Sequence, residues 1–319
     1  MVMAQSLFRL LKERDPQRPL DILAPAWSLP IVARMPEVRR GIASQTAHGE
    51  LGFSKRRRIA AGLRGDYDSA IVLPRSFKAA LIPWLARIPR RTGFRGESRF
   101  FLVNDVRPFD PVRLDQTVKR FVALGLEAGE ELPDELPLPA LRVDAENRAR
   151  VLQALGLPAD RPVVGMMPGA EYGPAKCWPL EYFAELARRL DGIGYAVWIL
   201  GSEKDRPAGD RIAAASEAEN LCGRTSLEDA IDLLSACEHA VSNDSGLMHI
   251  AAAVGTHVHG IFGSSSPKFT PPLTKNREIH EIDLDCRPCF ERECPLGHLK
   301  CLRDLRPDAV FDKVAVKTA

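Results

Sequence analysis

The chain has 319 residues, of which 45% are hydrophobic, so it can bury a core large enough for two domains. Lys and Arg number 44 and Asp and Glu number 42, so no overall positive field attracts nucleic acid, and we expect no nucleic-acid partner. No run of about eighteen apolar residues occurs and the start lacks the layout of a secretory signal, so we expect a cytoplasmic protein.

The first predicted element is a helix, because Met3, Leu7, Leu10 and Leu11 recur at helical spacing. A short buried strand follows at residues 20–25, and apolar runs then alternate with helical stretches to about residue 110. This rhythm is typical of an α/β domain. Such a domain normally places a strand before its first helix, yet no strand precedes this one.

A segment rich in Pro and acidic residues, 127–144, has neither a helical nor a strand period. We therefore predict an N-terminal domain over residues 1–140, a linker region over 141–160 and a C-terminal domain over 161–319. Beyond the linker, strands are expected at 161–167, 195–200, 238–244 and 256–262, and helices at 179–194, 226–237 and 245–255. Two α/β halves predict paired Rossmann-like domains facing a cleft.

The stretch HAVSNDSGLMHIAAAVG contains a predicted anion site. An apolar strand ends at Asn243 and Asp244, and a small-residue helix starts with Ser245, Gly246 and Leu247. The free N–H groups and the dipole of such a helix start favour phosphate. The alternative is that Asp244 merely caps the helix.

Two further residues follow predicted strands of the C-terminal half. Lys176 lies in the loop PGAEYGPAKCWP, where its charge could offset a leaving diphosphate without a metal ion, or could simply be solvated. Glu203, in LGSEKD, is suited to hold ribose hydroxyls. The phosphate-binding glycine motifs of dehydrogenases and P-loop NTPases are absent.

Arginines and lysines gather in two loops of the N-terminal half, in LPRSFKAAL and IPRRTGFRGESRFFLVNDVR. The cluster, which could grip phosphates or carboxylates of an acceptor, consists of Arg75, Lys78, Arg90, Arg91, Arg95 and Arg99. Of these, Arg75, Lys78, Arg91 and Arg95 are the candidate acceptor-binding residues, with solvated surface as the alternative. The run KRRR at 55–58 is interpreted as a solvated helix face or a weak attraction to anionic lipid.

Four of the seven cysteines crowd into one segment, at Cys286, Cys289, Cys294 and Cys301. The first two have the spacing of zinc ligands, whereas the second two are wider apart than in common zinc modules. A structural zinc site, packed reduced thiols and a redox device all remain open.

Together these stretches make the chain resemble the ADP-heptose:lipopolysaccharide heptosyltransferases of glycosyltransferase family 9. The resemblance covers nearly the whole chain and is carried, in order, by LPRSFKAAL, IPRRTGFRGE, LVNDVR, PGAEYGPAKCWP, SNDSGLMHIAAA and GSSSPKFTPPL. It implies a GT-B architecture, with the donor on the second domain and the acceptor on the first. It also implies a metal-independent, inverting transfer of L-glycero-D-manno-heptose from ADP-heptose to the first heptose of the lipopolysaccharide inner core.

The resemblance also assigns roles. Lys176 and the segment from Asp244 to Leu247 would hold the diphosphate, Glu203 the ribose and the loop around Thr225 the adenine. No cofactor would be required. The protein would work as a peripheral protein at the cytoplasmic face of the inner membrane.

One feature departs from the family, whose members begin with a short apolar strand and a Gly-containing loop ending in Asp. That Asp is the expected general base, and it would stand just before Met1. We therefore expect the N-terminal domain to lack its first strand and the chain as it stands to be impaired in transfer, because of a start codon assigned too late.

Three other functions stay open at this point. The chain could be a nucleotide-sugar-binding protein without activity, or a sister heptosyltransferase that acts on another core sugar. It could also be a metal-binding interaction module built on the four cysteines.

Overall fold

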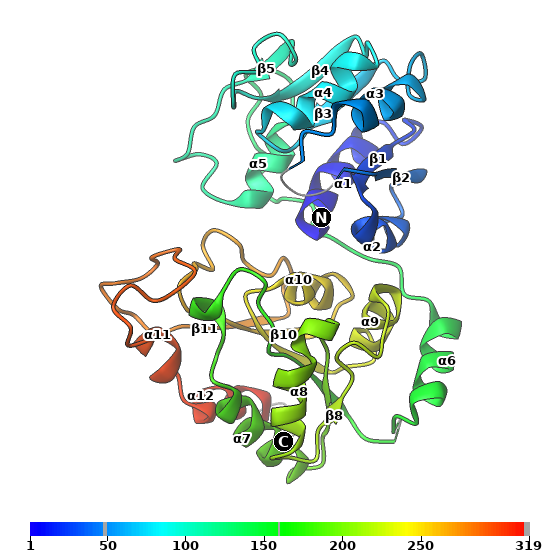
Figure 1. The fold of residues 1–319 in the computed structure, drawn as a ribbon. Coiled ribbons are helices and arrows are strands. Elements are labelled where there is room, and N and C mark those ends of the chain that lie inside the picture. Colours follow the sequence, from blue (N-terminus) through cyan, green and yellow to red (C-terminus); the bar gives the residue numbers. More distant parts are fainter. Residues whose placement is uncertain (47–49, 159, 316–319) are drawn as a thin grey trace. The chain divides into compact units, whose positions relative to one another are not determined.

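The computed structural model describes residues 1–46, 50–158 and 160–315, and the chain divides into two compact units (Figure 1). The first unit extends to Pro137 and the second begins at Leu138. Both units have the α/β composition predicted from the sequence.

The first unit begins with the predicted helix. Its helices are α1 (Gln5–Arg14), α2 (Leu29–Ala33), α3 (Phe53–Ala61), α4 (Phe77–Leu85) and α5 (Thr117–Ala123). One face of α1 is buried, including Leu7, Leu10 and Leu11 as their spacing indicated. Gly125 lets the chain after α5 come close to α1, because a Cβ atom there would lie 2.4 Å from Leu7 Cδ1.

The strands of the first unit form two parallel sheets in the described residues. β1 (Asp21–Pro25) pairs with β2 (Arg40–Ser44), while β3 (Ser69–Val72), β4 (Arg90–Phe94) and β5 (Asp105–Arg107) form the other sheet. Side chains of both sheets pack against one apolar cluster, which residues of α3 and α4 and of the segments after them form. The strand expected before Met1 stays a prediction.

The second unit is built on one parallel sheet in the order β11-β10-β9-β6-β7-β8. Its strands are β6 (Val163–Met167), β7 (Ala196–Ile199), β8 (Glu219–Asn220), β9 (His239–Asn243), β10 (His257–Ile261) and β11 (Arg277–His280). Every residue of β6, β7 and β9 is buried, as in parallel sheets covered on both faces.

The helices of the second unit include α7 (Leu180–Asp191), α8 (Arg206–Ala213), α9 (Leu227–Leu234) and α10 (Gly246–Ala253), as well as α11 (Lys300–Arg303) and α12 (Pro307–Ala315). Phe183 and Leu186 of α7 and Val310 of α12 share one core cluster with Val241 of β9. The main core of this unit therefore lies between these helices and one face of the sheet.

The linker predicted over 141–160 is wrong, because this range contains helix α6 (Ala145–Leu155), which belongs to the second unit. The side chain of Asp144 caps the helix by accepting from the Asn147 N–H group at 3.0 Å. Only Val151 of this helix is fully buried. The sequence therefore has no apolar periodicity that would have predicted a helix here. Polar contacts with α9 hold α6 in place instead.

We predict that Asp232→Ala loosens α6 from the rest of the unit. The buried Asp232 carboxylate accepts from the Asp144 N–H group at 2.9 Å and from Asn147 Nδ2 at 2.8 Å. Removing it leaves both donors without this acceptor and should lower the free energy of unfolding by about 1–3 kcal/mol. Urea unfolding measures this, with the exposed Gln153→Ala on the same helix as a control that should change little. Equal stability of the two variants would contradict the assignment.

Candidate functional site

The order of the second sheet contains a switch point between β6 and β9. From β6 the chain proceeds to β7 on one side, whereas β9 pairs with β6 on the other. Loops that leave the two central strands therefore diverge, and ligands of open α/β sheets bind at such a point, beyond the carboxyl ends of the strands. The loop 168–179 leaves β6 there, and the start of α10 leaves β9.

Lys176 and Asp244 meet at this point. Lys176 Nζ lies 2.6 Å from Asp244 Oδ2, and the two side chains are 16% and 5% exposed. The alternative of a solvated loop lysine is therefore wrong. The alternative of Asp244 as the cap of α10 is also wrong, because the cap residue is Ser245, whose side chain makes no capping hydrogen bond. The carboxylate instead fixes the position of the ammonium group.

The start of α10 faces open space. A Cβ atom built on Gly246 would meet no atom within 4 Å. The first N–H groups of a helix have no partner within the helix, and the dipole makes its amino end positive. An anion placed there would lie beside the Lys176–Asp244 pair, because Asp244 is two residues before the helix.

Asn243 is a residue whose role the sequence did not reveal. It is fully buried, its Oδ1 accepts from the Trp178 N–H group at 3.0 Å, and its Nδ2 donates to the Pro168 carbonyl at 2.6 Å. One amide thus holds both ends of the loop that carries Lys176. The sequence feature that could have indicated this role is a polar residue at the end of an apolar strand, because a buried polar group needs hydrogen-bond partners.

Glu203 and Thr225 lie beyond the neighbouring strands β7 and β8. The Glu203 carboxylate covers Gly223, where a Cβ atom would be 2.0 Å from its Oε2, and φ at Gly223 is +71°. Glycine is therefore required at this turn. Thr225 follows two residues later, half-buried, just before Ser226 caps α9. Both predicted residues are thus at the same edge of the sheet as Lys176.

The cysteine segment forms hydrogen bonds with the loop that carries Lys176. The Ala175 N–H group donates to the Arg292 carbonyl at 3.0 Å, and Tyr172 Oη donates to the Phe290 carbonyl at 2.5 Å. The ammonium of Lys176 lies 5.1 Å from the centre of the Tyr172 ring. The position of Lys176 therefore depends on the backbone between Cys289 and Cys294.

The four cysteines of the segment, all free, line one small cavity together with His298. Backbone N–H groups, that of Leu299 first, lower the pKa of the Cys294 thiol. In the described part of the chain, however, the only group of three or more potential metal ligands within 4.8 Å of one another is formed by histidines. The structural zinc at the cysteines stays a prediction.

The basic residues of the first unit are placed differently from one another. Arg75 and Arg95 are exposed, with their guanidinium groups over the rings of Phe109 and Phe100 at 4.4 and 5.0 Å. Lys78 is half-buried on α4.

Two other arginines of these loops serve the backbone. Arg91 donates to the carbonyls of Leu102, Ile88 and Pro89. Arg99, which the sequence groups with the basic cluster, is buried and donates to the carbonyls of Pro74 and Phe94 at 2.6 Å each. Arg99 thereby joins the loop after β3 to the end of β4. The contact of Arg91 with an acceptor stays a prediction.

Comparisons with known proteins agree with this arrangement. Residues 56–300 match the family described as glycosyltransferase family 9 (heptosyltransferase). The chain is 42% identical to lipopolysaccharide heptosyltransferase 2 of Salmonella typhimurium and 41% identical to that of Escherichia coli, each match covering 98% of this chain and 94% of the relative.

Solved structures show the same similarity. The structure of Escherichia coli ADP-heptose lipopolysaccharide heptosyltransferase II matches 99% of this chain and 94% of its own, with a TM-score of 0.87 at 39% identity. A family 9 glycosyltransferase from Veillonella parvula shares the fold, with a TM-score of 0.82 at 17% identity. The chain has the GT-B fold and belongs to glycosyltransferase family 9, the heptosyltransferases.

Proposed function

We propose that the chain transfers L-glycero-D-manno-heptose from ADP-heptose to the first heptose of the lipopolysaccharide inner core. The support is its similarity, over nearly the full length of both chains, to relatives named lipopolysaccharide heptosyltransferase 2. Two further relatives, named lipooligosaccharide heptosyltransferase 2, match 98% of this chain at 40% and 41% identity. The second unit would bind the donor and the first unit the acceptor.

The observation that carries the mechanism is the fixed ammonium group of Lys176 beside an open helix start. In the proposed reaction an acceptor hydroxyl attacks the anomeric carbon, the new glycosidic bond forms with inversion, and the bond to the diphosphate breaks. Negative charge develops on the leaving ADP, where Lys176 and the N–H groups of Ser245, Gly246 and Leu247 would stabilise it. Asp244 acts through Lys176, because a carboxylate would repel the phosphate.

The same positive groups explain why we propose a reaction that needs no metal ion. Lys176 contributes a full charge and the helix start a partial one, which together take the place that a divalent cation has in other transferases. Glu203 would accept hydrogen bonds from the ribose hydroxyls, and the loop at Thr225 would contact the adenine. A general base would take the proton of the acceptor hydroxyl, and its identity stays a prediction.

The acceptor would be held by basic and aromatic groups of the first unit. Arg75, Lys78 and Arg95 suit the phosphates and carboxylates of an inner core. Phe100 and Phe101, 63% and 61% exposed, lie in the loop after β4 and offer apolar contact near them. These groups support a peripheral contact with an anionic membrane surface. None of the described helices is both long and apolar enough to span a bilayer.

Transfer is tested by incubating the protein with ADP-heptose and core acceptors that carry no heptose or one heptose. We expect mass spectrometry to show one added heptose, with inverted anomeric configuration, only on the acceptor that already carries one. Preference for the acceptor without heptose would indicate a sister enzyme. Binding of ADP-heptose without any product would favour a binding protein.

We predict that Lys176→Ala lowers the turnover number by about 10²-fold or more, since one electrostatic contact to the developing charge is lost. The exposed Lys275→Ala removes a charge from the same unit and should leave turnover unchanged. Steady-state kinetics and thermal melting separate the effect on catalysis from one on folding. Equal turnover of the two variants would refute the role of Lys176.

We also predict that EDTA does not abolish transfer, because Lys176 and the start of α10 provide the positive charge. Turnover is measured after dialysis against EDTA and again after Mg²⁺ is restored. Activity that appears only with added Mg²⁺ would show that the assignment of the leaving-group contact is wrong.

For the cysteine segment, we predict that Cys286→Ser with Cys289→Ser lowers the melting temperature more than it lowers turnover per folded molecule. The segment holds the loop of Lys176 through hydrogen bonds to its backbone carbonyls, and we assign no catalytic group to it. Turnover is normalised to the fraction of protein that binds ADP. A selective loss of turnover at an unchanged melting temperature would overturn this view.

A further inference from the structure

Four of the seven histidines lie on the strands β9, β10 and β11 of the second sheet. His257 of β10 is in register with His239 of β9. His259 lies two residues after His257 and therefore on the same face of the sheet. His280 ends the neighbouring strand β11. Their spacing on adjacent strands thus gathers imidazoles at one place, and the proposed transfer reaction uses none of them.

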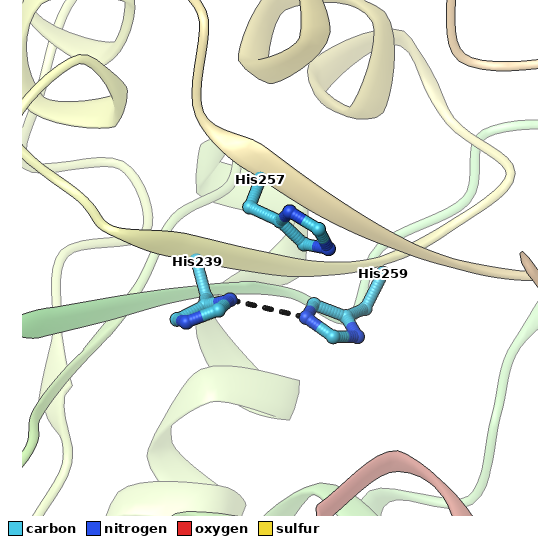
Figure 2. A group of neighbouring side chains, drawn as sticks. All are labelled: His239, His257 and His259. Carbon is cyan, nitrogen blue, oxygen red and sulfur yellow. Dashed lines mark hydrogen bonds between the residues drawn. The ribbon is translucent and has the colours of Figure 1, made fainter. Parts of the chain in front are cut away.

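The rings of three histidines face one another (Figure 2). One nitrogen from each of His239, His257 and His259 lies within 4.8 Å of the others, and His239 Nδ1 is 3.1 Å from His259 Nε2. Two nitrogens bound to one tetrahedral zinc ion at the usual Zn–N length would be about 3.3 Å apart. The separation of His239 and His259 is close to this value, whereas the nitrogen of His257 would have to move inward to bind the same ion.

The other nitrogens of two of these rings also face suitable partners. His259 Nδ1 lies 3.2 Å from His280 Nε2, and His239 Nε2 lies 3.7 Å from the Glu238 carboxylate. Metal-binding histidines characteristically form a hydrogen bond through the second nitrogen, as His259 does here, since the partner fixes the tautomer and the orientation of the ring.

The three rings differ in how deeply they are buried. His239 and His259 are fully buried, whereas His257 is half-buried and leaves a side from which an ion could enter. The ring of Tyr195 packs 6.0 Å from that of His239. An imidazole binds a metal ion through a ring lone pair, which its neutral form offers.

We propose that His239, His257 and His259 bind a divalent transition-metal ion of the zinc type, through Nδ1 of His239, Nε2 of His259 and one ring nitrogen of His257. Imidazole ligands select Zn²⁺, Co²⁺, Ni²⁺ or Cu²⁺ over Mg²⁺ and Ca²⁺. Three protein ligands leave one position for water. The ion would tie β9 to β10.

The proposed ion takes no part in sugar transfer. His239 is the first residue of β9, whereas Asn243, which holds the Lys176 loop, is the last. At about 3.3 Å per residue the two lie roughly 13 Å apart along the strand. Removal of the ion should therefore lower the melting temperature without abolishing turnover, so the metal site and the proposed function can fail independently.

The test is titration of the metal-free full-length protein with Zn²⁺ and Co²⁺. We expect about one ion bound per chain and, at a hundredfold excess over Kd, a rise in melting temperature of roughly 5–10 °C. Bound Co²⁺ should show the absorption of a nitrogen and oxygen shell. The absorption of a thiolate–cobalt complex would place the ion at the cysteines and overturn the proposal, as would the absence of binding.

The variant His257→Ala should weaken binding by at least about tenfold, since it removes one ligand from a half-buried position. The matched control is His298→Ala, which changes a histidine of the cysteine segment and should bind the ion as the wild type does. Unchanged affinity of His257→Ala, or weakened affinity of His298→Ala alone, would refute the site. If His257→Ala does not fold, X-ray absorption of the zinc-loaded wild type decides, with a nitrogen shell supporting the site and a sulfur shell refuting it.

Discussion

The ion pair between Lys176 and Asp244 is the constraint on which the proposed donor site depends. It joins a loop that leaves β6 to the residue that follows β9, and it does so with both side chains largely buried. A buried charge that loses its partner is costly, so each member holds the other in place. The pair leaves the ammonium group beside the open start of α10 with little freedom to move away from an anion. That is the preorganisation which stabilisation of a leaving diphosphate requires.

Further hydrogen bonds hold the loop that carries Lys176 in position. Asn243 binds both ends of the Lys176 loop, and the carbonyls of Phe290 and Arg292 hold its middle. The cysteine segment therefore has a structural connection to the site, whatever state its thiols adopt. His239 and His257 begin β9 and β10, and His259 lies in the middle of β10. We therefore expect an ion bound by these histidines to act on stability and not on transfer.

The first unit shows how one residue type serves different purposes in one loop. Arg75 and Arg95 are exposed over aromatic rings, whereas Arg91 and Arg99 turn their guanidinium groups to backbone carbonyls. A guanidinium has five N–H donors in a fixed plane, so one arginine side chain can donate to several backbone carbonyls at once. Arg75 also donates to the Arg95 carbonyl at 3.3 Å, so its exposed guanidinium takes part in both kinds of contact.

The sequence alone determined the α/β class, most strands of the second sheet, and the loops on which Lys176, Glu203 and Asp244 lie, because buried parallel strands are continuous apolar runs. The loop of Thr225 was indicated only by the family resemblance. The sequence missed α6, whose contacts with α9 are mainly polar, and it could not separate Arg91 and Arg99 from Arg75 and Arg95. Only the tertiary structure paired Lys176 with Asp244, 68 residues apart, and gathered three histidines from two strands. The physical reason is that periodicity reports which face of an element is buried, whereas pairing depends on strand order and register, which bring together residues far apart in the chain.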